Sequence, residues 1–375
     1  MRIAVLGAGM VGRTIAIDLA QHHEVSSFDI NTENLSKLKA LHPGIETVQT
    51  NLKEYANYES LLSTFEFVVS AVPGFMGYRV LETVIKCGKN IVDISFFPED
   101  ALQLDQLAKS KNVTAVVDCG VAPGMGNLIL GYHDQQMKIN RFECMVGGLP
   151  KKRVKPFEYK APFSPADVLE EYIRPARYVE NSCIVTKPAL SDAELIDFEE
   201  AGTLESFNTD GLRSILFTMK HIPDMKEKTL RYPGHIALIQ SLIKAGFLSL
   251  TPININGNAV VPAEFTAALL FDQWKLEDNE AEFTIMKIIL EGIKNEKNCT
   301  IEYLLYDEYD AATGFSSMSR TTGYACTAAV NLVLNGLFTQ KGIFPPEFIG
   351  PVPGCFEFVM KYLEERNVTY KKKVY

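Results

Sequence analysis

The sequence predicts an α/β protein in which a doubly wound parallel sheet is followed by a second, α+β domain. Short β-rich runs alternate with helix-like stretches up to about residue 120, as expected when crossover helices join parallel strands. From about residue 140 the pattern changes to hairpin-like and helical pieces with several prolines. The length of 375 residues exceeds what one core usually holds and suits two domains.

Six strands are expected in the first domain, separated by segments with helical spacing. They are residues 2–7, 24–29, 45–50, 65–72, 89–95 and 113–120. The second domain is predicted to contain strands at 144–149, 204–209 and 301–310 and helices at 165–173, 210–220 and 235–247. An apolar segment rich in small residues, 321–338, is predicted to be a helix that packs back on the first domain. The expected boundaries are therefore 1–122, 123–317 and 318–375.

Composition and charge exclude several classes of protein. Apolar residues make up 47% of the chain, yet no run reaches the roughly 18 residues that a membrane span needs. The first strand starts at residue 2 or 3, which leaves no room for a leader, so we expect a cytoplasmic protein. A net charge of −9 with only two short basic runs, 151–153 and 371–373, argues against a nucleic-acid partner.

Spacing of the reactive residue types excludes further chemistry. The seven cysteines include no C-x-x-C pair, and the six histidines show no H-x-x-x-H spacing, so we expect neither a disulfide framework nor a metal site. A Walker loop and a G-x-S-x-G elbow are both absent from the sequence, which argues against phosphoryl transfer and serine hydrolysis.

A glycine-rich turn follows the first predicted strand. It consists of Gly7, Ala8, Gly9, Met10, Val11 and Gly12. This G-x-G-x-x-G pattern lies between a strand and a helix, where glycines allow a tight turn, the approach of a pyrophosphate and close helix packing. The helix N-terminus would hold the pyrophosphate. We therefore predict a dinucleotide-binding Rossmann domain in which these six residues contact the cofactor.

The cofactor is predicted to be NAD. Asp29 ends the second predicted strand, seventeen positions after Gly12, where a carboxylate accepts hydrogen bonds from the adenosine ribose and repels a 2′-phosphate. No arginine or lysine follows before Lys37. The fourth strand ends in another set of candidate cofactor contacts, Val72, Pro73 and Gly74. The alternative for this set is a plain strand-to-helix turn.

Six dispersed segments carry a family resemblance. They are residues 118–127, 147–150, 163–182, 209–216, 229–235 and 315–323. In this order they resemble the saccharopine dehydrogenase and L-lysine 6-dehydrogenase family nearly end to end. The resemblance is greatest to the lysine 6-dehydrogenase branch. It implies oxidation of the lysine ε-amine with NAD to an aldehyde that cyclises, with release of ammonia.

Ala122 distinguishes the branches of this family. Fungal saccharopine reductases usually carry an acidic residue directly before the Pro-Gly pair, whereas this chain has Ala122 before Pro123 and Gly124. This departure favours lysine over saccharopine. Saccharopine dehydrogenase, or another reductase that joins carbon to nitrogen, is the alternative within the family. A non-catalytic NAD(H)-binding sensor is the alternative of another class.

Amine oxidation requires a general base, because a carbon bearing a protonated nitrogen does not readily release hydride. Asp93 and Asp118 end the fifth and sixth predicted strands, at the sheet edge where ligands bind in such folds. The alternative for Asp93 is a helix cap. His235 follows a Pro-Gly turn in segment 229–235 and is a third catalytic candidate, with core packing as its alternative.

An amino-acid substrate also requires a cation for its α-carboxylate, and arginine can supply two parallel hydrogen bonds. The candidates are Arg231, Arg213 and Arg174. The alternative for each is an ion pair with a nearby acid, namely Glu170, Glu171 or Asp210. Three further residues, Gly124, Asn127 and Gly148, are expected near the substrate, Gly148 within a turn at 147–150 and Asn127 as a donor or a helix cap.

Two further expectations concern Asp210 and assembly. Asp210 is predicted to cap the helix over 210–220, because its side-chain oxygen would reach the free N–H groups of the first turn. An α+β domain with an open sheet often buries one face against its twin, so we expect a homodimer or a dimer of dimers.

Overall fold

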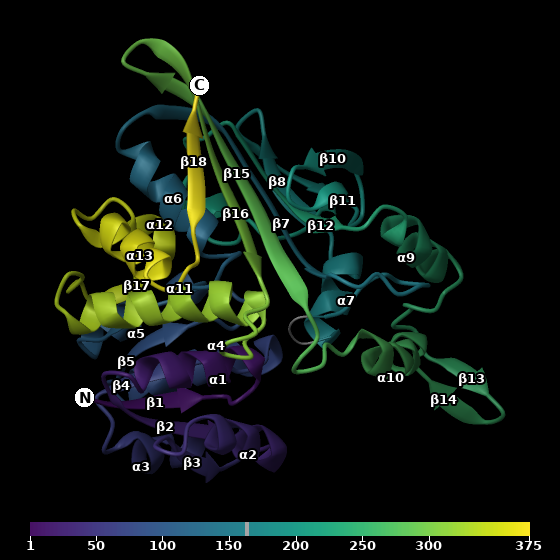
Figure 1. Ribbon diagram of the computed structural model, residues 1–375. Coiled ribbons are helices and arrows are strands. Elements are labelled where there is room, and N and C mark those ends of the chain that lie inside the picture. Colours follow the sequence, from purple (N-terminus) through teal and green to yellow (C-terminus); the bar gives the residue numbers. More distant parts are fainter. Residues whose placement is uncertain (162–164) are drawn as a thin grey trace. The chain divides into compact units, whose positions relative to one another are not determined.

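The computed structural model describes residues 1–161 and 165–375, which form two units (Figure 1). Unit 1 comprises Met1–Lys138 and Met318–Thr369, and unit 2 comprises Ile139–Ser317 and Tyr370–Tyr375. These ranges differ from the expected boundaries at two places. Helix α6 (Met125–Asp134) belongs to unit 1 because it packs against α12 (Pro346–Ile349) and α13 (Cys355–Glu364). Strand β18 (Tyr370–Val374) pairs with the sheet of unit 2.

Unit 1 is built on a parallel sheet, which confirms the predicted α/β class. Its strands are β1 (Arg2–Leu6), β2 (Glu24–Asp29), β3 (Glu46–Gln49), β4 (Phe67–Ser70), β5 (Asn90–Asp93), β6 (Thr114–Val116) and β17 (Gly342–Phe344). They lie in the order β17-β6-β5-β4-β1-β2-β3, and every pairing is parallel. From β1 the chain adds β2 and β3 on one side and then β4, β5 and β6 on the other. The strand order therefore switches between β1 and β4, which is where such folds bind ligands.

Helices wind around this sheet and close its core. They are α1 (Met10–Leu19), α2 (Thr32–Leu41), α3 (Tyr58–Leu62), α4 (Gly74–Lys86), α5 (Asp105–Ser110) and two short 3₁₀ turns (Tyr55–Asn57 and Ala101–Leu104). The Asn31 side chain caps α2 by accepting the backbone N–H of Glu33 at 2.8 Å. The core joins buried strand residues such as Leu6 and Val68 to Val80 and Val84 of α4.

The C-terminal helices belong to the same unit. Helix α11 (Ser317–Leu334) lies against α1, because Thr14 Oγ1 donates to Ser319 Oγ at 3.0 Å and Thr327 Oγ1 donates to Asp18 Oδ2 at 2.6 Å. Asp18 also accepts from Arg366 Nε at 2.7 Å. A Cβ on Gly323 would lie 3.3 Å from a methyl carbon of Thr14, which explains the small residues of α11.

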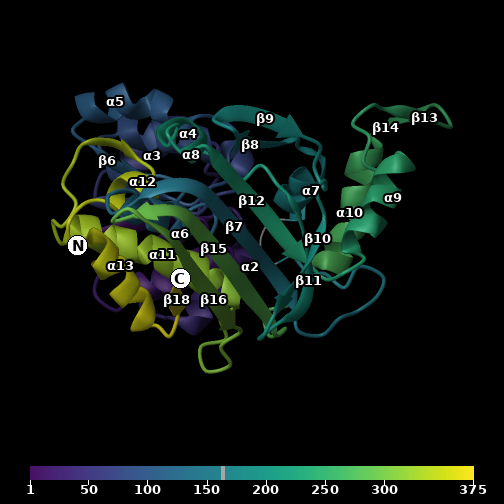
Figure 2. The same cartoon turned by 90° about the horizontal axis from the view of Figure 1, so that it is seen from above.

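Unit 2 contains a mixed sheet whose long strands lie side by side (Figures 1 and 2). Its strands are β7 (Lys138–Pro150), β8 (Ala176–Glu180), β9 (Cys183–Lys187), β10 (Glu194–Phe198), β11 (Gly202–Asn208), β12 (Asp224–Arg231), β15 (Glu282–Lys294), β16 (Lys297–Glu308) and β18. The main order is β10-β11-β12-β7-β15-β16-β18, with β8 pairing to β12 and β9. Strands β7 and β12 are parallel. The pairs β10–β11, β11–β12, β12–β8, β8–β9, β15–β16 and β16–β18 are antiparallel.

The smaller elements of unit 2 are short helices and a separate two-stranded hairpin. They are α7 (Pro165–Ile173), α8 (Ile215–Thr218), α9 (His235–Lys244), α10 (Pro262–Trp274) and the hairpin of β13 (Ile253–Ile255) and β14 (Asn258–Val260). The core gathers around Trp274, which is fully buried. Residues 163 and 164, which open the motif 163–182, lie outside the described residues.

Two sequence predictions in unit 2 were wrong. A helix was expected over 210–220, but the structure forms only α8 there. Asp210 does not cap this helix, because the Asp210 carboxylate accepts both the backbone N–H and the guanidinium of Arg177. The turn expected at 147–150 is the end of β7. A Cβ on Gly147 would lie 2.7 Å from the Leu230 carbonyl oxygen, so glycine here permits close approach of a neighbouring strand rather than a turn.

Candidate cofactor and catalytic site

The glycine loop lies between β1 and α1. Its three positions favour glycine for different physical reasons. A Cβ on Gly7, which has φ +105°, would clash with the Ala71 carbonyl, and one on Gly12 would clash with the Gly7 carbonyl. A Cβ on Gly9 would meet nothing within 4 Å. Packing within the chain therefore accounts for Gly7 and Gly12, whereas Gly9 leaves open space of the kind that a close-lying ligand fills.

The first turn of α1 offers donors to an anion. Gly9 is its N-cap, no side chain caps the helix and no acidic residue stands in the first turn. Met10 and Val11 are half-buried and Ala8 is buried. Free N–H groups and the positive end of the helix dipole favour a phosphate at this place.

Asp29 connects the end of β2 to this loop. Its Oδ2 accepts the backbone N–H of Ala8 at 2.7 Å, and its Oδ1 accepts the N–H of Asn31 at 2.8 Å. A carboxylate has about four acceptor positions, so capacity for ribose hydroxyls remains. Lys37 pairs with Glu33 at 3.0 Å on the outer part of α2.

The end of β4 lies directly beside the glycine loop. Val72 is buried, Pro73 is the N-cap of α4 and Gly74 begins the helix. Gly7 approaches the Ala71 backbone closely. These three residues therefore lie beside the glycine loop, at the switch in strand order between β1 and β4. The residues present at this edge fit a pyridine dinucleotide. That all ten predicted residues contact this cofactor stays a prediction.

Asp93 ends β5 and is completely buried. Its Oδ1 accepts the backbone N–H of Ser95 at 2.6 Å, while its Oδ2 has no hydrogen-bond partner. Burial is the main cause that raises the pKa of Asp93 from 3.8 to about 7; the nearby Asp118 carboxylate contributes a small part of this rise, and the hydrogen bond from the Ser95 N–H opposes it. The structure thus brings both predicted carboxylates together and gives Asp93 the pKa of a base that works near neutral pH.

Asp118 follows β6 in a left-handed backbone conformation, φ +52°. It is buried, and the N–H of Cys119 donates to the Asp93 carbonyl at 3.2 Å. Gly124 has φ +144°, and a Cβ there would clash with the Gly120 backbone. Asn127 is buried in α6 and donates to Glu347 Oε2 at 3.1 Å, and its contact with substrate stays a prediction.

Arg231 ends β12 and is enclosed within unit 2, with 3% of its surface exposed. Its Nη2 pairs with Glu171 Oε2 at 3.1 Å and its Nε donates to the Tyr172 hydroxyl at 3.2 Å. Its guanidinium also lies 4.4 Å from the centre of the Tyr159 ring. The structure therefore has the ion pair that was the alternative for Arg231, and substrate binding by Arg231 stays a prediction.

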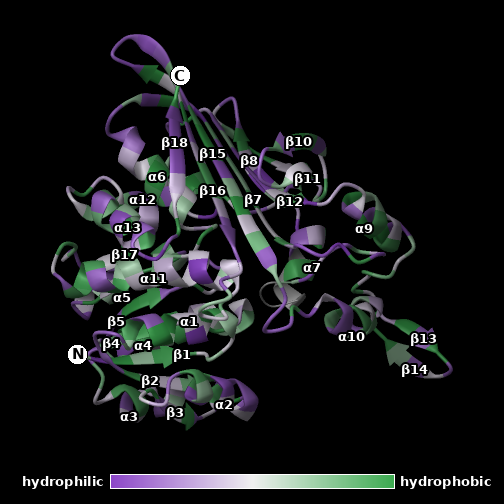
Figure 3. Cartoon of the chain, viewed as in Figure 1, coloured by the Kyte–Doolittle hydropathy of each residue, from purple (hydrophilic) through white to green (hydrophobic). Residues whose placement is uncertain are grey.

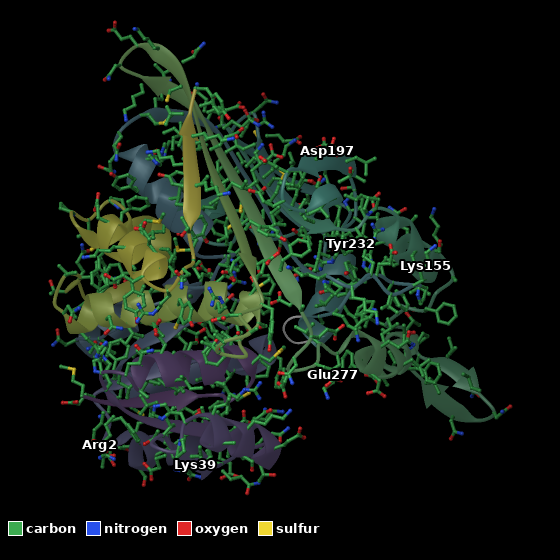
Figure 4. The ribbon with its side chains drawn as sticks, in the orientation of Figure 1. Arg2, Lys39, Lys155, Asp197, Tyr232 and Glu277 are labelled. Carbon is green, nitrogen blue, oxygen red and sulfur yellow. The ribbon has the colours of Figure 1, made fainter. Side chains whose placement is uncertain are left out.

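His235 begins α9, three residues after Tyr232, which Figure 4 labels in unit 2. Its Nδ1 lies 2.9 Å from the Phe157 carbonyl oxygen and its Nε2 lies 2.9 Å from the Tyr172 hydroxyl. A carbonyl can only accept, so Nδ1 carries the proton and Nε2 accepts from Tyr172. Burial and the charge of Arg231 lower the pKa of His235 to about 3. The Nε2 lone pair is thus used within unit 2, as in the core-packing alternative, and a catalytic role for His235 stays a prediction.

The sequence did not single out Tyr172, Tyr159 or Trp274 as partners of Arg231 and His235. The three aromatic residues come from separate parts of the chain and meet only in the folded core, so no local pattern could have indicated them. Arg213, with φ +53°, and Arg174, which follows α7, are both half-buried in unit 2. Gly148 lies in β7.

The fold and the glycine loop define a protein with a Rossmann-type dinucleotide-binding domain. A family model described as the saccharopine dehydrogenase NADP binding domain matches residues 3–116, and one described as the saccharopine dehydrogenase C-terminal domain matches residues 117–368. The chain therefore belongs to the saccharopine dehydrogenase family of oxidoreductases, as the six motifs predicted.

Several known proteins resemble the chain over most of its length. Saccharopine dehydrogenase [NADP(+), L-glutamate-forming] of Schizosaccharomyces pombe is 21% identical over 92% of this chain and 93% of its own. Carboxyaminopropylagmatine dehydrogenase of Synechocystis is 20% identical, with 94% of both chains covered. Mouse mitochondrial alpha-aminoadipic semialdehyde synthase is 20% identical over 94% of this chain. This chain spans about half of that relative, 46%.

A solved structure supports the fold. Apo saccharopine dehydrogenase (L-Glu forming) of Saccharomyces cerevisiae superposes with a TM-score of 0.81, covering 100% of this chain and 99% of its own, at 19% identity. At this identity the likeness establishes the fold, and the α/β class with a second mixed-sheet domain is confirmed. In the described part of the chain, no helix combines the length and apolar character needed to span a membrane. Residues 1–161 and 165–375 also contain no cluster of three His, Cys, Asp or Glu side chains suited to a metal ion.

Proposed function

We propose that this protein oxidises the ε-amine of lysine with NAD, giving an aldehyde and ammonia. The observation that carries the proposal is Asp93, a buried carboxylate at the ligand edge of the sheet with one unpaired oxygen and a pKa near 7. An ammonium group must lose a proton before its carbon can release hydride, and a base of this pKa is matched to that task.

The proposed reaction balances with one water. A bound nicotinamide nucleotide supplies the hydride acceptor. Asp93 Oδ2 takes a proton from the ε-ammonium, and loss of hydride from the adjacent carbon leaves an iminium. Asp93 releases this proton to solvent and, as a carboxylate again, takes a proton from the water that adds to this carbon. It returns that proton to the nitrogen, the carbon–nitrogen bond breaks, and the hydroxyl proton passes to the leaving ammonia, which departs as ammonium. One ammonium, one aldehyde and one reduced cofactor form, and one proton is released.

The α-carboxylate of lysine still requires a cation. The sequence indicated three arginines for this role: Arg231, which pairs with Glu171, and two more, Arg213 and Arg174. Both are half-buried residues of unit 2, and substrate binding by either is a proposal.

NAD is proposed over NADP on the evidence of Asp29. The matching family model and the yeast relatives carry NADP in their names, whereas this chain ends β2 with a carboxylate held at the glycine loop. A carboxylate there repels the 2′-phosphate of NADP. Lys37, the first cation after Asp29 in the sequence, pairs with Glu33 at 3.0 Å.

Saccharopine dehydrogenase is the second candidate function, and the names of the relatives favour it. The yeast relatives that match this chain are named as L-glutamate-forming saccharopine dehydrogenases. Ala122 before Pro123-Gly124 favours lysine instead, because the family pattern for saccharopine carries an acid there.

A paired assay tests the proposal. Purified protein is incubated with NAD and either L-lysine or saccharopine, and reduced cofactor, ammonia and glutamate are measured in the same tubes. Formation of ammonia in equal amount to reduced cofactor from lysine alone supports the proposal. Glutamate formation from saccharopine, without turnover of lysine, overturns it in favour of the second candidate. Binding of NADH without turnover of either substrate would support the sensor.

A further inference from the structure

Two buried serines lie beside Asp93 in the parallel sheet of unit 1. Figure 3 shows β1, the strand next to β4, mostly in the hydrophobic colour. The middle residues of β4 and β5 are also apolar, and each strand ends in a polar residue, Ser70 in β4 and Asp93 in β5. Ser70 is fully buried, and Ser95, two residues after Asp93, is 3% exposed. Burial of a hydroxyl in such surroundings is costly unless it is hydrogen-bonded.

Ser70 lies next to Asp93 across the two strands. The two residues are register partners in the parallel β4–β5 pair, and the N–H of Ile94 donates to the Ser70 carbonyl at 3.0 Å. Register partners point their side chains to the same face of a sheet, because side chains alternate along each strand. Val68 and Ile91, two residues earlier on each strand, belong to the core that includes α4. The Ser70 hydroxyl and the Asp93 carboxylate therefore lie together on the face that α4 covers.

Ser95 completes this polar group. Its backbone N–H donates to Asp93 Oδ1 at 2.6 Å, and its Oγ lies 3.4 Å from Ser70 Oγ. Helix α4 contacts the same residue, because a Cβ on Gly77 would lie 2.5 Å from the Cβ of Ser95. The absence of a side chain at Gly77 therefore permits the loop after β5 to lie directly against the helix, with Ser95 held between the helix and the carboxylate.

The two hydroxyls also act on the charge of Asp93. Burial is the main cause that raises the pKa of Asp93, and the Ser70 and Ser95 hydroxyls oppose this rise together with the Ser95 N–H. A donor near a carboxylate favours its charged form. Each hydroxyl therefore offsets part of the cost of burying this carboxylate.

Other titratable groups do not take over this task. Among the described residues, the titratable side chains that face Asp93 are Asp118 and Cys119, which follow β6, and Cys326 of α11. Asp118 raises the pKa of Asp93. Burial raises the pKa of both thiols, that of Cys119 to about 12, so both stay neutral near pH 7. These groups supply no positive charge, which leaves the hydrogen-bond donors to stabilise the carboxylate.

We propose that Ser70 and Ser95 are positioning residues for Asp93, which fix its carboxylate and stabilise the ionised form. This inference rests on the proposed function, in which ionised Asp93 takes the proton of the substrate amine. Neither serine contacts the reacting atoms in this role. Each acts through the carboxylate, so the pH dependence of the reaction reports its contribution.

The first test is the pH dependence of kcat/KM for lysine in Ser70→Ala and Ser95→Ala. Losing a donor to a charged group should move the midpoint of the profile upward by about one pH unit, because the carboxylate then stays protonated to a higher pH. At pH 7 kcat/KM should fall ~5-fold and should approach the wild-type value at pH 9. Ser70→Thr keeps a hydroxyl and a strand-forming residue, and should retain the wild-type midpoint.

Ser27→Ala is the matched control. It removes a fully buried hydroxyl of β2 that has no hydrogen-bond partner among the described residues, and the midpoint should not change. Circular dichroism and the midpoint of thermal unfolding confirm that each variant is folded. A loss of activity that is equal at every pH would overturn the inference, because it would mark the two serines as structural only.

A direct titration separates this inference from the proposed function. The ¹³C signal of the Asp93 carboxyl carbon, assigned with Asp93→Asn, reports the ionisation of Asp93 without substrate. A titration that moves upward by about one pH unit in both alanine variants, and not in Ser27→Ala, supports the inference. The same titration in wild type and both alanine variants overturns it. If the wild type does not turn over lysine, the proposed function fails, and the titration still decides whether the two hydroxyls stabilise the carboxylate.

Discussion

The carboxylate of Asp29 accepts the backbone N–H of Ala8 at 2.7 Å, so the end of β2 holds the glycine loop in place. One side chain thus performs two tasks. It fixes the backbone on which a pyrophosphate would rest, and it places a negative charge where the adenosine ribose of the cofactor is expected.

Asp29→Ala is expected to reverse the proposed cofactor preference. Removing the carboxylate removes both the acceptor for the ribose hydroxyls and the repulsion of a 2′-phosphate, so kcat/KM for NAD should fall at least ~10-fold relative to that for NADP. Kinetics with both cofactors give the ratio. Glu59→Gln removes an exposed acid of α3, leaves the Lys37–Glu33 pair intact and should leave the ratio unchanged. An equal loss with both cofactors would indicate that Asp29 only supports the loop.

Asp93→Asn is expected to abolish most turnover. Loss of a positioned base costs about 10²- to 10⁴-fold in kcat, while the binding of NADH, followed by fluorescence, should persist. In the wild type, kcat/KM should rise with pH and level off above the Asp93 pKa of about 7, because the carboxylate must be ionised to accept a proton. Glu99→Gln, in the exposed loop after β5, serves as the control. A pH profile unchanged in the residual activity of Asp93→Asn would exclude Asp93 as the titrating group.

The same pKa predicts a stability effect. The folded-state pKa of Asp93 is raised from 3.8 to about 7, so the stability that protonated Asp93 contributes is present at low pH and is lost as the pH rises through 7. Between pH 5 and pH 8 the free energy of unfolding of the wild type should therefore fall by about 2 to 3 kcal/mol relative to Asp93→Asn. Urea unfolding at the two pH values measures this difference. A constant difference would show that Asp93 ionises as freely as in the unfolded chain.

The parallel sheet and the ligand edge could be predicted from the sequence because their signals are local. The glycine loop follows β1, and Asp29 and Asp93 are the last residues of β2 and β5; each of these strands is β-rich. Two strands lack such a signal: β17 has only three residues, and β18 reads Tyr-Lys-Lys-Lys-Val. Both become strands because they pair with a neighbour in the folded protein. The partners of Arg231 likewise could not be predicted, because Glu171 and Tyr172 approach β12 only in the folded protein.

Asp18 is expected to be a main anchor of the C-terminal helices in unit 1. Its side chain is 2% exposed and accepts Arg366, Tyr362 and Thr327 within 2.7 Å. Asp18→Ala leaves Arg366 without its carboxylate, and breaking a buried ion pair costs about 3 to 5 kcal/mol. Lys361→Ala, which breaks an exposed pair with Glu365, should cost less than about 1 kcal/mol. Equal shifts of the denaturant midpoint in the two variants would contradict the buried role of Asp18.

His235 is expected to stay neutral across the physiological pH range. Arg231 Nε donates to the Tyr172 hydroxyl, this hydroxyl donates to His235 Nε2, and His235 Nδ1 donates to the Phe157 carbonyl. Burial raises the pKa of Tyr172 to about 12, so the tyrosine keeps the proton that this chain of hydrogen bonds requires. Protonation of Nε2 would place two donors against each other beside the Arg231 charge.

The sign of the pH effect follows from the lowered pKa. The unfolded chain binds a proton on this histidine near pH 6.5, whereas the folded protein does so only near pH 3, so stability is lost as the pH falls. From pH 7 to pH 4 the wild type should lose about 3 kcal/mol relative to His235→Gln. The ¹⁵N spectrum, assigned with this variant, should show a neutral imidazole protonated on Nδ1 throughout. An imidazole signal that titrates near pH 6.5 would mean that the ring is reached by water and would favour His235 as a candidate base.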